Sequence, residues 1–75
     1  MITKYRVFCL VIEIGSFTKA AKILGYSQSA VSQIVKSLER ELGTILVNRG
    51  KDGIRLTSDG EQFLPYLQAI QVAEN

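Results

Sequence analysis

One stretch of the chain decides the fold: residues 27–43, which read SQSAVSQIVKSLERELG. Its apolar residues recur at offsets 0, 3, 4, 7 and 11, the spacing of one helix face: Val31, Ile34, Val35, Leu38 and Leu42. A polar stripe repeats these offsets from two residues earlier, about 200° round the helix: Ser29, Ser32, Gln33, Lys36 and Arg40. The stretch therefore predicts a two-faced helix over 28–42, with Ser27 as its N-cap and Gly43 at its end.

Two shorter helices are predicted before this stretch. Helical spacing of apolar residues indicates the first over about 3–14, and Gly15 ends it. Ser16 is the N-cap candidate of the second, which Gly25 ends and whose inward face we expect to consist of Phe17, Ala20, Ala21 and Leu24. The short link that contains Gly25 is typical of the turn in a helix-turn-helix.

The segment after Gly43 predicts a β-hairpin. Residues 45–47 and 54–56 are β-prone runs, and the cluster Gly-Lys-Asp-Gly at 50–53 is a turn signal. We call residues 45–56 the wing. Its tip and flanks carry three cations, Arg49, Lys51 and Arg55.

A long final helix is predicted after the wing. Thr57 and Ser58 open it, and Ser58 with Glu61 has the form of a capping box. Pro65 should bend this helix, because it lacks an N–H group and its ring crowds the preceding turn. The apolar residues of the helix are expected to contact a partner helix or to pack on the body: Phe63, Leu64, Leu67 and Ile70.

Composition allows one small domain and excludes most enzyme chemistry. The chain has 75 residues, 47% of them hydrophobic, no histidine and a single cysteine, so neither a zinc cluster nor a Cys/His or Ser/His nucleophile can be assembled. We expect no catalytic residues, no metal and no cofactor. No apolar run is long enough for a transmembrane helix, and no signal peptide is visible, so we expect a cytoplasmic protein.

The net charge of +2 hides an uneven distribution. Residues 1–57 hold all nine Lys and Arg but four Asp and Glu, which gives +5, whereas the remaining eighteen residues carry −3. A basic body followed by a mildly acidic helix suggests that only the body faces an anion.

This layout predicts a mainly α, winged helix-turn-helix fold, with a three-helix core and a two-stranded wing, followed by a long C-terminal linker or dimerisation helix. We assign residues 1–57 to a DNA-binding domain and 58–75 to the linker helix. In such a fold the third helix enters the major groove of DNA. There Gln28 and Gln33 can pair with adenine edges, and Lys36 can reach guanine or phosphate. The wing can follow the DNA backbone or a narrow minor groove.

Four linked motifs also closely resemble the N-terminal DNA-binding domain of LysR-type bacterial transcriptional regulators. They are GSFTKAA at 15–21, SQSAVS at 27–32, LERELG at 38–43 and LTSDG at 56–60. The resemblance implies a homodimer joined through the last helix that binds an AT-rich interrupted inverted repeat. It also implies that three residues contact phosphates: Ser16, Thr18 and Ser27. The residues that it places in the groove are Gln28, Ser29, Ser32, Gln33 and Lys36, and its wing contacts are Arg49 and Arg55.

Some alternatives stay open. Full regulators of this family continue into an effector-binding domain, which is absent from these 75 residues, so the chain is either a fragment or a truncated regulator. A small-molecule effector would require that missing domain. The competing function is a winged-helix module that binds protein without DNA. If the last helix dimerises the chain, Leu67→Glu should give a folded monomer.

Overall fold

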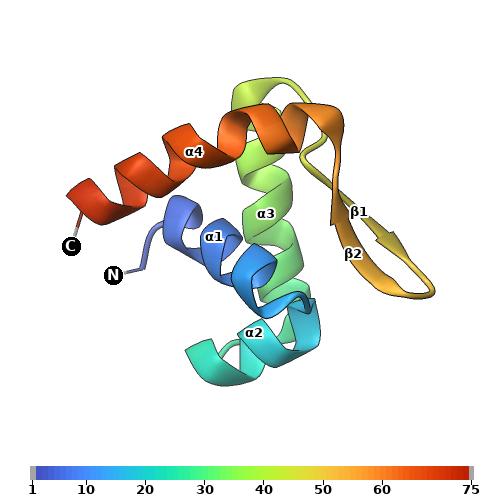
Figure 1. Ribbon diagram of the computed structural model, residues 1–75. Coiled ribbons are helices and arrows are strands. Elements are labelled where there is room, and N and C mark those ends of the chain that lie inside the picture. Colours follow the sequence, from blue (N-terminus) through green and yellow to red (C-terminus); the bar gives the residue numbers. More distant parts are fainter. Residues whose placement is uncertain (1, 75) are drawn as a thin grey trace.

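Glycines and capping residues divide the chain into the helices and strands that the sequence predicts. The computed structural model describes residues 2–74 (Figure 1), and their order is α1 (Lys4–Ile14), α2 (Phe17–Leu24), α3 (Gln28–Leu42), β1 (Val47–Gly50), β2 (Gly53–Leu56) and α4 (Ser58–Ala73). The predicted fold is confirmed: a mainly helical winged helix-turn-helix with a two-stranded antiparallel wing. Within residues 2–74, no helix has the length and apolar character needed to span a membrane.

The predicted helix caps at the helix-turn-helix are confirmed. The Ser16 hydroxyl accepts a hydrogen bond from the Lys19 N–H at 3.1 Å, and the Ser27 hydroxyl accepts one from the Ala30 N–H at 3.0 Å. Gly25 ends α2 with φ +74°, a conformation that favours glycine. These local features set where α2 begins, where it ends and where α3 begins.

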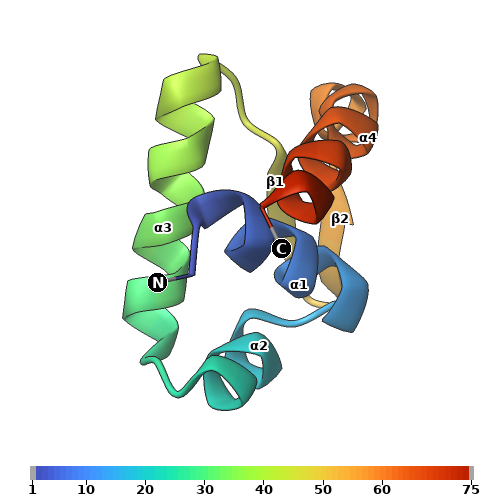
Figure 2. The same cartoon turned by 90° about the vertical axis from the view of Figure 1, so that its left-hand side faces the viewer.

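The hydrophobic core lies where α1 meets the other three helices. Figure 2 shows α1 between α3 and α4, with α2 across one end, and α1 contacts all three. The largest fully buried side chains come from α1, α3, α4 and the segment before β1: Phe8, Leu38, Leu46, Leu67, Val7, Val11, Val31 and Val35. The predicted apolar stripe of α3 therefore faces inward.

One of the interface residues predicted in the last helix, Leu67, is buried within the subunit. The Leu67 side chain is only 2% exposed and belongs to the core of the subunit, so it is not available to a partner. For the same reason we no longer expect Leu67→Glu to give a folded monomer. Phe63 and Leu64 are half-buried against the core, whereas Ile70 is 40% exposed.

Two element boundaries also differ from the prediction. The N-cap of α4 is Thr57, whose hydroxyl accepts a hydrogen bond from the Gly60 N–H at 2.9 Å, so the predicted capping box of Ser58 and Glu61 was wrong. The hairpin pairs Val47 with Leu56 and Gly50 with Gly53, which starts β1 two residues later than expected. Leu46 is outside the ladder although its carbonyl accepts from the Thr57 N–H, because its own N–H donates to the Glu39 carboxylate and not to Thr57.

Candidate nucleic-acid interface

The polar stripe of α3 forms an accessible surface. Ser29, Gln33, Lys36 and Arg40 are exposed and Ser32 is half-buried, while the opposite side of the helix packs in the core. This surface presents hydroxyl, amide and cationic groups, which are the groups that hydrogen-bond to base edges and phosphates.

The first turns of α2 and α3 lie together at one end of this surface. The Thr18 hydroxyl donates to the Gln28 side-chain oxygen at 3.2 Å. An open hollow of about 340 Å³ is lined by residues of both turns and of the wing, among them Ser16, Thr18, Gln28 and Arg49. The hydroxyl oxygens of Ser16 and Ser27 accept the capping hydrogen bonds, which leaves each O–H free in principle to donate to an anion. Four predicted site residues therefore share one concave surface.

The wing cations lie on two different faces. Arg49 is opposite Ile54 and Arg55 is opposite Asn48 in the ladder. Because successive residues of a strand point to opposite faces, Arg49 shares the inner face with Ile54, and Arg55 shares the outer face with Asn48. The sequence does not distinguish the three wing cations, and the strand register separates them. Lys51 is exposed at the tip.

Arg49 connects the wing to both helices of the helix-turn-helix. Its guanidinium lies over the Phe17 ring, 3.7 Å from the centroid, and donates to the Ser32 hydroxyl at 2.8 Å. A cation over an aromatic face is an attractive contact of about 0.5–1 kcal/mol at exposed sites. Two predicted site residues thus contact each other in the free protein, and they place the wing beside α3.

Glu39 of α3 is not among the site residues predicted from the sequence. Its side chain is buried, with 8% exposed, and its Oε2 accepts hydrogen bonds from the Leu46 N–H at 2.7 Å and the Val47 N–H at 3.3 Å. Its hydrogen-bond partners are backbone groups of a different element, so no side-chain pattern in the sequence points to them. The only signal for its burial is that an acid lies next to the apolar stripe of α3.

Glu41, the other acid near the end of α3, has a different environment. It accepts a hydrogen bond from the Tyr5 hydroxyl at 2.9 Å and forms an ion pair with Lys4. The Lys4 ammonium, followed by the Tyr5 hydroxyl, holds the pKa of the Glu41 carboxyl below its usual value of 4.5. These contacts attach α3 to α1 on the side away from the wing.

Comparison with known proteins gives consistent results. Residues 2–61 match the family model described as bacterial regulatory helix-turn-helix protein, lysR family. The chain is 45% identical over 69 residues to the probable HTH-type transcriptional regulator LrrA of Synechococcus elongatus, covering 92% of this chain and 24% of that protein. It is 47% identical over 64 residues to the HTH-type transcriptional regulator CrgA of Neisseria meningitidis, covering 85% of this chain and 21% of that protein. The chain thus spans about a quarter of the length of these relatives.

Two solved structures of DNA complexes have the same fold. The structure titled CbnR_DBD-DNA complex superposes with a TM-score of 0.86 at 34% identity, covering 95% of this chain and 82% of that one. The BenM_DBD/catB site 1 DNA complex gives a TM-score of 0.84 at 36% identity, covering 93% of this chain and 79% of that one.

Proposed function

Because the chain belongs to the LysR family of bacterial regulatory helix-turn-helix proteins, we propose that it is the part of a transcriptional regulator that binds double-stranded DNA in a sequence-specific way. The observation that carries the proposal is the exposed polar stripe of α3 beside a wing with three cations. The role is binding rather than catalysis, and its place is the cytoplasm, where bacterial DNA lies.

In this proposal α3 lies in the major groove, and each group of residues has a separate role. Gln28, Ser29, Ser32, Gln33 and Lys36 face the groove. Ser16, Thr18 and Ser27 contact phosphates near the helix N-termini, where free N–H groups and the helix dipole favour anions. Lys51 and Arg55 contact the backbone or the minor groove. Arg49, also of the wing, donates a hydrogen bond to the Ser32 hydroxyl and so reaches the polar face of α3.

The proposed regulator binds as a dimer to an AT-rich interrupted inverted repeat, with residues 1–57 as the DNA-binding domain and 58–75 as the linker helix. The dimer contact uses the exposed apolar side of α4. Phe63, Tyr66 and Ile70 follow helical spacing, and Tyr66 and Ile70 are 70% and 40% exposed. Leu64 is half-buried against the core and lies about 100° round the helix from Phe63, away from Tyr66 and Ile70. A small-molecule effector belongs to the proposal only if an effector-binding domain follows in the full protein.

Two substitutions test the division between groove and wing. Selection of bound duplexes from a random pool first supplies the preferred site. On that site Gln33→Ala should cost about 1–3 kcal/mol and relax the base preference, because a bidentate base contact is lost. Arg55→Ala should weaken binding to all sequences similarly and reduce the salt slope by about one, because a phosphate contact is lost. Identical behaviour of the two variants in fluorescence anisotropy would contradict the division.

A further inference from the structure

The wing needs attachment to the rest of the domain, because a two-stranded hairpin is at best marginally stable by itself. Its strands pair only with each other in the described sheet. Two hollows of about 420 and 230 Å³ lie between α3 and the chain that enters β1. The surface is therefore open on this side of the junction, although Leu46 and Val47 themselves are buried, and specific contacts help to fix the wing relative to α3.

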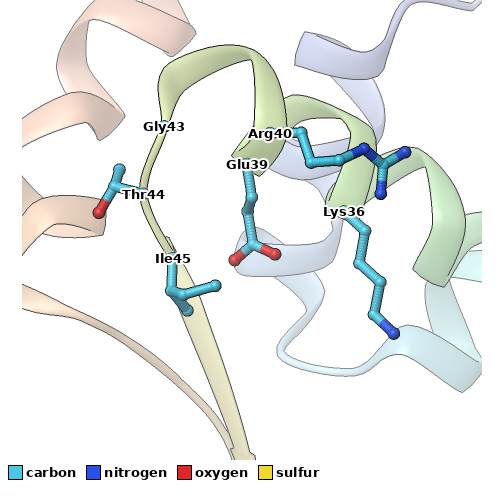
Figure 3. Close-up of a pocket in the computed structure, with 6 residues that line it drawn as sticks. All are labelled: Lys36, Glu39, Arg40, Gly43, Thr44 and Ile45. Carbon is cyan, nitrogen blue, oxygen red and sulfur yellow. The ribbon is translucent and has the colours of Figure 1, made fainter.

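Glu39 supplies one such contact at the base of the wing. Figure 3 shows its carboxylate pointing from α3 toward the segment at Ile45, while Lys36 and Arg40 extend away from that segment. The carboxylate accepts from two successive backbone N–H groups, those of Leu46 and Val47. Hydrogen bonds to a charged acceptor are stronger than neutral ones, and burial strengthens them further.

The peptide that Glu39 holds is also fixed from its other side. The Leu46 side chain is fully buried, and its carbonyl accepts from the Thr57 N–H at 2.9 Å. The Thr57 hydroxyl in turn donates to the Ile45 carbonyl at 2.6 Å. The start of β1 is thereby held between α3 and the N-terminus of α4, and of these contacts only Glu39 reaches it from α3.

We propose that Glu39 is a positioning residue for DNA binding: its buried carboxylate, bonded to the Leu46 and Val47 N–H groups, sets the position of the wing relative to α3. The inference rests on the proposed function, in which α3 and the wing contact the same DNA duplex. A wing held in place contacts phosphate without first losing conformational freedom, which favours binding.

The test is a double-mutant cycle in which DNA affinity is measured. One change is made at Glu39 and the other at the cations of the wing. The wing variant combines Lys51→Ala with Arg55→Ala and should weaken DNA binding at least about tenfold in the otherwise native chain. In the presence of Glu39→Asp the same change should cost less than about threefold. The shorter carboxylate cannot reach both N–H groups, and Arg49, which contacts Ser32 and Phe17 further along β1, does not by itself fix the base of the wing. Glu39→Gln keeps the reach of the oxygen, so the wing cations should keep most of their effect.

Glu41→Asp is the matched control, since it shortens an acid on the same helix that contacts α1 instead of the wing. It should leave the effect of the wing variant unchanged. A purely structural role for Glu39 would lower the melting temperature but leave the wing effect in Glu39→Asp at tenfold, and this result would overturn the inference. A native chain whose binding does not respond to the wing variant would instead contradict the wing contacts of the proposed function.

Hydrogen exchange in the unaltered protein provides a measurement that does not depend on a variant that folds. The Leu46 and Val47 amide protons should exchange as slowly as those in the middle of α3, because opening them breaks buried charged hydrogen bonds. Exchange at the rate of an open loop would overturn the inference.

Discussion

Leu67→Glu is expected to unfold the domain. The change removes a buried leucine, which by itself costs about 2–5 kcal/mol, and it places a carboxylate in an apolar core, which adds a further penalty. The side chain is 2% exposed in the single subunit. For a domain of this size the sum is comparable with the whole free energy of unfolding. Circular dichroism should therefore show no cooperative melt near the melting temperature of the native chain.

The matched control is Ile70→Glu, one turn later on α4. Ile70 is 40% exposed, so glutamate there remains solvated and the chain should keep its melting temperature within a few degrees. If α4 forms the proposed dimer, sedimentation should show that this variant is a folded monomer. A Leu67→Glu chain that melts like the native one would contradict the placement of Leu67 in the core.

Gly60→Ala is expected to destabilise the domain by about 3 kcal/mol, the upper part of the range for overpacked sites. A Cβ at Gly60 would collide with the Leu46 carbonyl oxygen and lie 3.0 Å from its carbon. That peptide cannot shift easily, because its carbonyl accepts from the Thr57 N–H and its N–H, that of Val47, donates to Glu39. The melting temperature should fall by about 12–24 °C.

The sign of this effect is informative because replacing glycine by alanine in a helix normally stabilises it, by up to about 1 kcal/mol in a helix interior. Gly50→Ala is the control, since a Cβ there would meet the Gly53 carbonyl oxygen at an ordinary contact distance of 3.8 Å. We expect that variant to change stability by less than about 0.5 kcal/mol. Unchanged or increased stability of Gly60→Ala in thermal melts would show that α4 does not approach Leu46 this closely.

Local signals in the sequence predicted most of the fold. The N-caps at Ser16 and Ser27 and the glycine at the end of each of the first three helices act within a few residues, so a single sequence contains them. The predicted N-cap of the last helix, Ser58, was wrong by one residue. Thr57 and Ser58 both carry a hydroxyl, so the sequence does not distinguish them. Only the backbone geometry shows which hydroxyl reaches Gly60.

The long-range contacts could not be predicted from the sequence. Apolar residues lie on several sides of α4, so their spacing did not show that Leu67 faces inward and Ile70 outward. Glu39 and Arg49 contact groups at least seven residues away, on other elements. For the candidate site, the sequence predicted the exposed stripe of α3, but it gave no information about which face of the wing each arginine occupies.

The most direct test of the account is titration of the protein against an AT-rich duplex with an interrupted inverted repeat at several salt concentrations. Each phosphate that a cation neutralises contributes about −0.9 to the slope of log K against log salt. With cations on both α3 and the wing, the account predicts a slope of about −3 or steeper. A module that binds only protein would give no binding or a flat response, and this result would contradict the proposed function.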